Sequence, residues 1–195
     1  MRRRCGNWKT WSRYSIARAE GVISAPAAQL LVTNWISPEV QGENADQDET
    51  TFDYEVRRYV YDHAMNEGLP PTVAETASAL STRLDDVGVS LQRLADGHIL
   101  VLQKGTGEIL MANPFSAVPT PFLVRAGDSS WYGNCIWDAM GIPAMLQQDA
   151  AIEASCGCCG TAMHLAVADG SLEEAPGIAH FAIPAAHWWD DIVFN

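Results

Sequence analysis

The sequence has few basic residues outside its first twenty positions. Six of its twelve Lys and Arg residues lie within residues 1–20, beside one acidic residue, Glu20. The other 175 residues carry 6 basic and 23 acidic residues, a net charge of −17. Because nucleic-acid binding depends on clustered cations that neutralise phosphates, this charge distribution argues against a nucleic-acid partner.

Long uncharged apolar runs are absent as well. No stretch reaches the roughly 18 apolar residues of a transmembrane helix, and the Arg-rich start lacks an apolar segment of signal-peptide length. The five cysteines are an odd number, and three of them lie within residues 156–159. This crowding argues against a disulfide framework. We therefore expect a cytoplasmic protein with reduced thiols and no membrane partner; the oligomeric state is left open.

The first quarter of the chain predicts little ordered structure. Residues 38–51 are polar and acidic, and such a segment cannot bury enough apolar surface to order itself. We expect residues 1–51 to form a poorly ordered leader, with order beginning near Phe52.

Three helix patterns and a hairpin pattern occupy residues 52–113. The first helix ends at Gly68, a common stop signal. Thr72 and Glu75 form a capping box that begins a second, short helix, and apolar spacing predicts a third helix over residues 84–95. Two strand-like segments around a Gly-Thr-Gly turn follow and predict a hairpin. This order predicts a winged-helix-like unit.

A winged-helix unit most often binds DNA, but the residues here favour a different role. The third helix and its flanks carry two basic residues against three acidic ones; these are Arg83, Arg93, Asp85, Asp86 and Asp96. A helix of this charge is poorly suited to phosphates. We therefore interpret the unit as a packing module and keep a winged-helix regulator as the less favoured alternative.

Short strands broken by Gly and Pro characterise residues 114–195. Three prolines near the start indicate an extended connector, and a short helix is expected to begin near Cys135. Strand patterns lie at residues 164–167 and 177–183, and a last one opens near Asp191. The whole chain is thus predicted to be α+β, with a small mixed β-sheet domain and short helices after the winged-helix-like unit.

The chemically most suggestive pair is Cys135 and Asp138. Asn134 is a good N-cap, which would place Cys135 on the first helical turn, where the helix dipole lowers a thiol pKa. Asp138, three residues on, would lie on the same face. A soft nucleophile beside a carboxylate can bind a soft metal and move a proton. The alternative is that Cys135 is a small buried apolar residue and Asp138 a surface residue.

A second cluster of thiols lies at Cys156, Cys158 and Cys159. Such closely spaced thiolates prefer thiophilic ions, with zinc and mercury both plausible. A structural zinc site needs four ligands, and no second Cys-x-x-Cys motif supplies them. The alternative is a Gly-rich turn with partly buried cysteines.

Several segments, in the right order, resemble the alkylmercury lyase family over residues 52–195. They are Leu110-Met-Ala-Asn-Pro-Phe-Ser-Ala-Val-Pro-Thr120, Asn134-Cys-Ile-Trp-Asp-Ala-Met-Gly-Ile-Pro-Ala144, the cysteine cluster at 156–159, His180-Phe-Ala-Ile-Pro184 and Trp188-Trp-Asp-Asp-Ile192. The resemblance implies a winged-helix-like part, residues 52–113, before a catalytic domain, residues 114–195.

The resemblance also implies an activity, the protonolysis of carbon–mercury bonds without a cofactor. Its substrate would be an organomercurial and its product mercuric ion. It makes Cys135 and Asp138 the catalytic pair, with Cys135, Cys156 and Cys159 as metal-binding residues. A family cysteine generally given a structural role falls on Cys156.

A second catalytic cysteine is expected at or directly after Asn195, so the catalytic domain looks C-terminally incomplete. A truncated gene or a selenocysteine codon read as a stop would both explain this. We expect this chain to bind mercury but to cleave carbon–mercury bonds poorly. The alternative function is thiol-based binding of a heavy metal without turnover.

A carboxylate on a first helical turn tends to stay ionised, which opposes its use as a proton donor. Burial against Trp131, Tyr132 or Trp137 would offset this tendency by removing water from Asp138.

Overall fold

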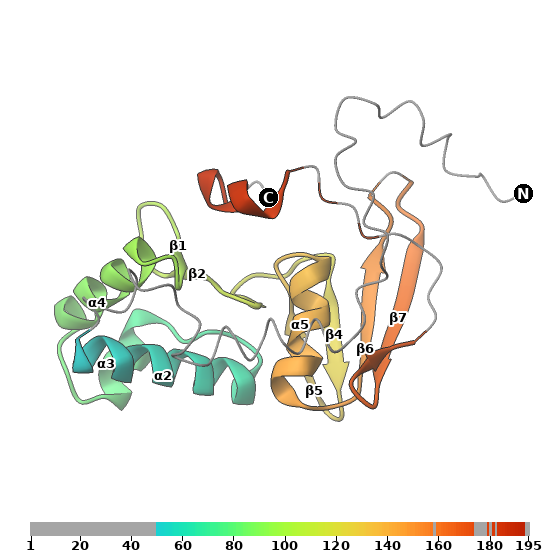
Figure 1. Cartoon of the computed structure of the whole chain (residues 1–195). Helices are drawn as coiled ribbons and strands as arrows, with labels where there is room; N and C mark the ends of the chain where they lie inside the picture. Colours follow the sequence, from blue (N-terminus) through green and yellow to red (C-terminus); the bar gives the residue numbers. More distant parts are fainter. Residues whose placement is uncertain (1–49, 158, 174–178, 180, 182, 194–195) are drawn as a thin grey trace, which may run out of the picture.

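A computed structural model describes residues 50–157, 159–173, 179, 181 and 183–193, and it combines helices with antiparallel sheets (Figure 1). The expected leader, residues 1–51, falls almost entirely outside the described residues. Thr50 caps the first described helix, which begins at Thr51. No helix among the described residues is long and apolar enough to cross a membrane.

Three helices come first along the described chain: α2 (Thr51–Glu67), α3 (Val73–Ala79) and α4 (Leu84–Asp96). The capping box predicted from Thr72 and Glu75 is confirmed, since each side chain hydrogen-bonds the other residue's backbone amide. Helix α2 ends at Gly68, whose φ of 86° is the left-handed conformation that glycine adopts without strain.

A small antiparallel sheet follows the helices, in the order β1-β2-β3. Its strands are β1 (Val101–Leu102), β2 (Ile109–Ala112) and β3 (Phe115–Ser116). Strands β1 and β2 form the expected hairpin. The third strand was not expected, and the assignment of residues 52–113 as winged-helix-like stays a prediction.

The second sheet has five antiparallel strands in the order β5-β4-β6-β7-β8. They are β4 (Leu123–Ala126), β5 (Ser129–Tyr132), β6 (Ala150–Ser155), β7 (Ala162–Ala168) and β8 (Ser171–Leu172). Helix α5 (Ile136–Leu146) packs against β4 and β6. A 3-10 helix, η3 (Ala185–Asp190), lies near the end of the described chain.

Three expectations for residues 114–195 are wrong. The predicted mixed sheet is antiparallel throughout. The connector predicted after Pro114 instead contains β3, β4 and β5, because the Gly127 turn, with a φ of 56°, lets the chain fold back on itself. Asp191 lies in a bend after η3, not at the start of a strand. The strand predicted at residues 177–183 lies largely outside the described residues.

The buried apolar residues form two clusters. One joins α2, α3 and α4 to β1 and β2, and it includes Val60, Leu91 and Ile109. The other joins α5 to the five-stranded sheet, and it includes Trp131 and Ile142. Both Ala64 in α2 and the partly buried Tyr61 connect the helices to the second cluster.

Helix α2 is fixed against strand β5 by two close contacts. The Trp131 indole Nε1 donates a hydrogen bond of 2.9 Å to the Ala64 carbonyl, which is buried. A Cβ added to Gly68 would lie 2.6 Å from the Ser130 carbonyl oxygen, so only glycine fits between the two backbones. These contacts set how the helices lie against the sheet that carries α5.

A buried ionic network ties α2 to α4. The Asp53 carboxylate accepts hydrogen bonds from Arg93 at 2.6 and 2.9 Å and from the Ser90 hydroxyl at 2.6 Å. Burial alone would raise the pKa of Asp53, but these hydrogen bonds and those from Thr50 hold it well below its usual range. Arg93 is thus engaged in packing the two helices together.

We expect Asp53→Ala to lower the free energy of unfolding by about 2–3 kcal/mol. The substitution leaves Arg93 and Ser90 without their hydrogen-bond acceptor and removes the α2 capping box. Urea unfolding measures the change. Glu55→Ala, an exposed acid on the same helix, is the matched control and should alter stability by less than about 0.5 kcal/mol. Equal effects of the two substitutions would contradict a stabilising role for the network.

Candidate functional site

The first turn of α5 carries both residues of the candidate site. Cys135 is the N-cap residue, with extended backbone angles of φ −144° and ψ −179°, and its carbonyl accepts the Ala139 amide at 2.9 Å. The prediction that Asn134 caps the helix is wrong by one residue. The Asn134 side chain instead donates a hydrogen bond to Asn113.

Cys135 and Asp138 lie within reach of each other, as their spacing predicted. The Cys135 Sγ donates to Asp138 Oδ2 over 3.6 Å. Both side chains are partly buried. A thiol proton therefore has a carboxylate beside it that can accept it.

The expected lowering of the Cys135 pKa is wrong. Burial, reinforced by the negative charge of Asp138, raises the pKa of the thiol to about 12. Hydrogen bonds from the backbone amides of Trp137 and Asp138 do oppose this rise, as expected at the N-terminus of a helix. Their effect is smaller than the cost of a thiolate with little water beside a carboxylate.

The pKa of Asp138 is raised, whereas the pKa of a carboxyl on a first helical turn is usually lowered. Burial raises its pKa to about 6, although hydrogen bonds from Asn134 and Cys135 lower it. Burial thus offsets the tendency of this carboxyl to stay ionised, as the sequence suggested. A carboxyl with this pKa exchanges a proton readily near neutral pH.

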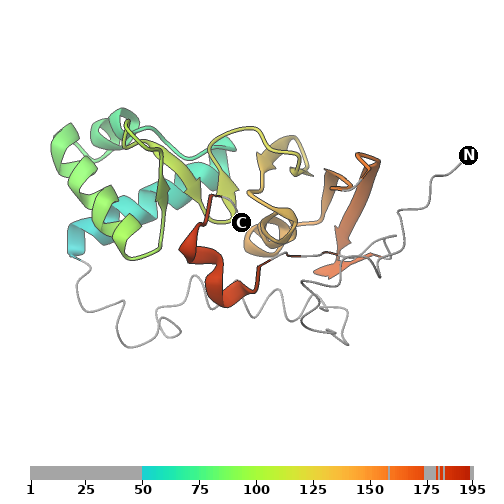
Figure 2. The same ribbon diagram turned by 90° about the horizontal axis from the view of Figure 1, so that it is seen from above.

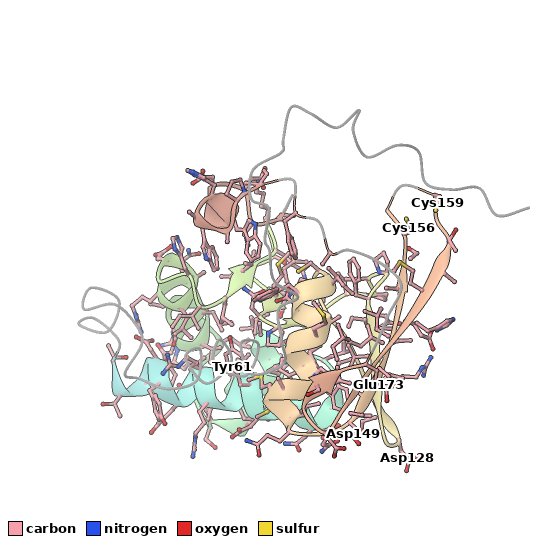
Figure 3. All side chains as sticks on the ribbon, turned by 45° about the vertical axis from the view of Figure 1, so that its right-hand side comes forward. Tyr61, Asp128, Asp149, Cys156, Cys159 and Glu173 are labelled. Atoms are coloured by element: carbon pink, nitrogen blue, oxygen red, sulfur yellow. The ribbon has the colours of Figure 1, made fainter. Side chains whose placement is uncertain are left out.

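Tyr61, on α2, is a neighbour of the site that the sequence did not indicate. Its hydroxyl donates to the Ile99 carbonyl over 3.4 Å. Burial raises the pKa of Tyr61 well above its usual range; Arg57 opposes the rise and Asp138 adds to it. The charge of Asp138 therefore acts on Tyr61 across the junction between α2 and α5. Figure 3 labels Tyr61 on the α2 side of this junction.

Asn134 connects the site to the turn between β2 and β3. Its Nδ2 donates to Asn113 Oδ1 at 2.9 Å and lies 3.4 Å from the Pro114 carbonyl. Its own Oδ1 is buried without a hydrogen-bond partner among the described residues. These hydrogen bonds hold Asn134, and with it the start of α5, against the Asn113-Pro114 segment, whose peptide bond is cis.

Gly133 allows the chain to pass very close to α5. A Cβ at this position would lie 2.6 Å from the Ala139 nitrogen and 2.9 Å from its Cα. The Gly133 carbonyl also accepts the Thr120 hydroxyl at 2.6 Å. Sequence reasoning missed this residue, although a glycine directly before the Asn-Cys pair is a typical sign of close backbone approach.

Cys156 and Cys159 lie at the tip of the β6–β7 hairpin (Figure 3). The Cys156 carbonyl accepts the Gly160 amide at 2.8 Å, and Cys159 Sγ lies 3.2 Å from the Thr161 hydroxyl. Helix α5 packs beside β6 and is joined to it by a short link, so the two run in opposite directions. The hairpin tip and the start of α5 therefore lie at the same end of the sheet.

Proximity at one end does not make these cysteines a single metal centre. Within the described part of the chain, no three His, Cys, Asp or Glu side chains are grouped closely enough to hold a metal ion. Cys158 lies outside the described residues. The Cys135–Asp138 pair and the Cys156–Cys159 pair are separate sets of side chains, and the soft donors among them are the thiols.

Aromatic rings from the end of the chain lie against the start of α5. Trp137 contacts Phe181 edge-on, with ring centroids 6.3 Å apart, and Phe181 contacts Trp188 at 5.1 Å. Trp189 stacks on His98 at 4.4 Å. Figure 2 shows η3 over the junction between the helices and the five-stranded sheet. Sequence reasoning gave Trp137 a role only in burying Asp138 and gave Phe181, Trp188 and Trp189 no contact with the site; the Trp188-Trp189 pair was the available signal.

Comparison with known proteins agrees with this arrangement. The family model "MerB: Alkylmercury lyase" matches residues 115–194, which include α5 and its Cys135–Asp138 pair. The solved structure "Crystal structure of the mercury-bound form of MerB2" is similar in fold, with a TM-score of 0.53 and 15% sequence identity. The similarity covers 78% of this chain and 66% of that one, so the chain spans about two thirds of its relative's length. No curated protein matches the chain.

The combination defines a mixed α+β protein with a thiol–carboxyl pair at a helix start. Residues 115–194 of this protein match the alkylmercury lyase family.

We expect Gly133→Ala to lower the free energy of unfolding by about 1–3 kcal/mol, because the added Cβ must displace the α5 backbone. Urea unfolding reports the change. Gly88→Ala is the control: its Cβ meets nothing within 4 Å inside α4, and it should be neutral or stabilising by up to about 1 kcal/mol. A neutral Gly133→Ala would show that α5 tolerates the displacement.

Replacing the buried carboxyl should stabilise the fold in a pH-dependent way. A carboxyl whose folded pKa is raised to about 6 destabilises the fold above that pH, and this cost disappears below its unfolded pKa. Asp138→Asn should therefore be more stable than the wild type by about 1–3 kcal/mol at pH 8, with the difference vanishing near pH 4.

Thermal or urea unfolding across this pH range measures the difference. Asp128→Asn, at an exposed turn position, is the control and should change stability by less than about 0.5 kcal/mol at pH 8. An advantage of Asp138→Asn that is constant with pH would mean that the carboxyl is not desolvated.

Proposed function

We propose that this protein cleaves carbon–mercury bonds by protonolysis, with Cys135 as the mercury-binding thiol and Asp138 as the proton carrier. The proposal rests on one observation above all. The Cys135 sulfur and the Asp138 carboxylate lie 3.6 Å apart on the first turn of α5, with burial favouring the protonated form of both. The match of residues 115–194 to the alkylmercury lyase model supports it.

In the first step, the thiol displaces a ligand from the organomercurial. The sulfur–mercury bond forms, the displaced ligand leaves as an anion, and the thiol proton passes to the Asp138 carboxylate. A thiol with a raised pKa can still react in this way, because a coordinating soft metal deprotonates its thiol outright. The raised pKa keeps the thiol protonated until the metal arrives.

In the second step, protonated Asp138 delivers its proton to the carbon bound to mercury. The carbon–mercury bond breaks, its electron pair forms the new carbon–hydrogen bond, and the hydrocarbon leaves. Mercuric ion stays on the Cys135 sulfur, and Asp138 is again a carboxylate. This is general acid–base catalysis by one carboxyl, and it needs no cofactor.

The pKa of Asp138 suits both steps. At about 6 it leaves most of the carboxyl ionised at neutral pH and able to accept the thiol proton. The same value makes the protonated form a much stronger acid than the thiol, whose pKa is about 12. Asp138 is thus a better donor to the carbon than Cys135 itself.

We propose that Cys156 and Cys159 bind mercuric ion at the hairpin tip. Cys159 is exposed and Cys156 is partly buried, so incoming thiophilic ions can reach this end of the sheet. The two cysteines would hold or pass on the metal separately from Cys135. This is also the arrangement expected of the alternative function, heavy-metal binding without turnover.

The proposed role of residues 52–113 is to support residues 114–195. We infer that they form a winged-helix-like packing module, since the Arg93 side chain is engaged by Asp53 and the Ala64 carbonyl by Trp131. The two apolar clusters fit a division near residue 113. Tyr61 would add to the burial of Asp138 from the α2 side.

Hydrocarbon release from methylmercury tests the proposed reaction. We expect slow methane release from the full chain and none from Cys135→Ser. That variant should also lose the mercury adduct at position 135, because a hydroxyl is a poor ligand for a soft metal. Asp138→Ala should bind methylmercury but release methane at least about 100-fold more slowly, the usual range for losing a general acid.

The pattern of losses separates the two functions. Stoichiometric mercury binding without any methane would favour the binding protein. Unchanged methane release by Cys135→Ser would rule out the proposed site. A matched substitution at the hairpin tip, Cys159→Ser, should reduce the mercury bound per chain while sparing the adduct at Cys135.

A further inference from the structure

Three aromatic rings stand beside the candidate site without a part in the two chemical steps. Trp137 lies between Cys135 and Asp138 in sequence, and successive residues of a helix are turned by about 100°. Its side chain therefore flanks Asp138 instead of sharing the face of the reacting pair. Phe181 and Trp188 extend this aromatic surface away from α5.

We propose that Trp137, Phe181 and Trp188 form an aromatic wall that contacts the organic group of the substrate and makes the site selective for arylmercury over methylmercury. The inference rests on the proposed function, because it assumes that mercury binds Cys135. It assigns these three residues to substrate selection and not to proton transfer.

The direction of proton transfer brings the organic group to this wall. The carbon bound to mercury must approach the Asp138 carboxyl to receive a proton, so the organic group lies on the Asp138 side of the Cys135 sulfur. The surface next to Asp138 on the first turn is Trp137, and Phe181 lies against it with centroids 6.3 Å apart. A flat ring attached to mercury would meet these faces and edges.

The wall has surface left for a ligand. All three rings are only partly buried in the protein. The contact between Trp137 and Phe181 is edge-on, so the faces of these two rings are not stacked on each other. Aromatic rings at such distances attract one another beyond the gain from buried area alone.

Contacts outside the ring-to-ring contacts of the wall hold η3 in place. Trp189 stacks on His98, with planes inclined by 8°. His98 adopts a φ of 60°, a left-handed conformation that is uncommon for residues other than glycine. The Trp188 indole donates to the Ile183 carbonyl at 2.9 Å. These contacts hold the rings in place before a substrate arrives, which lowers the entropic cost of binding it.

Competition between two mercurials tests the wall. Full-length chains with Cys135 as the sole thiol, and matched chains with Cys159 as the sole thiol, are given equal amounts of phenylmercury acetate and methylmercury chloride in glutathione buffer. Native mass spectrometry measures the ratio of phenyl to methyl adducts. We expect the ratio to be on the order of fivefold higher at Cys135 than at Cys159.

Variants of the wall locate the source of any selectivity. Phe181→Leu and Trp188→Leu keep apolar bulk but remove a ring, and each should lower the ratio at Cys135 toward that at Cys159. Tyr54→Leu, at an exposed aromatic of α2, is the control and should leave the ratio unchanged. Circular dichroism confirms that each variant is folded.

The outcomes separate this inference from the proposed function. Equal ratios at the two cysteines, or a ratio at Cys135 that neither substitution lowers, would overturn the wall while leaving the reaction intact. Selective phenyl binding at Cys135 without hydrocarbon release would support the wall and contradict the lyase. A Cys135 thiol that takes up neither mercurial would overturn both.

Discussion

The burial of one carboxyl, Asp138, is the constraint on which the rest of the site depends. An exposed carboxylate at the start of a helix would stay ionised, and because water screens its charge it would raise the pKa of neighbouring groups only a little. Limited access to water instead raises the pKa of Asp138 to about 6 and that of Cys135 to about 12. Asp138 can therefore exchange a proton near neutral pH, directly beside the sulfur of Cys135, which is a ligand for soft metals. A thiolate activated by the helix alone would bind mercury but would leave no acid to complete the reaction.

The surrounding fold provides this burial with few specialised contacts. Gly133 lets the chain pass directly against the first turn of α5, and Asn134 is tied to Asn113. Helix α2 approaches from the other side through the hydrogen bond between Trp131 and Ala64, which brings Tyr61 toward Asp138. The site thus depends on segments far apart in sequence, although Cys135 and Asp138 are three residues apart.

Local patterns were sufficient for the helices and for the contact between Cys135 and Asp138. The capping box at Thr72 and Glu75 and the three-residue spacing of Cys135 and Asp138 are local, so they could be read directly from the sequence. The short strands β4 and β5 were missed because prolines suggested a connector, whereas the Gly127 turn decides their pairing. The sign of the Cys135 pKa shift was also missed, because burial is a property of tertiary packing. Phe181 and Trp188 reach the site only through the fold.

The position of bound mercury tests the central claim most directly. A structure of the full chain with phenylmercury, located by its anomalous scattering, would show which sulfur binds the metal. The account predicts mercury bonded to the Cys135 sulfur, with Asp138 as the nearest carboxyl group and the phenyl group on the Asp138 side. Mercury bound only at Cys156 and Cys159, with the Cys135 thiol unoccupied, would contradict it.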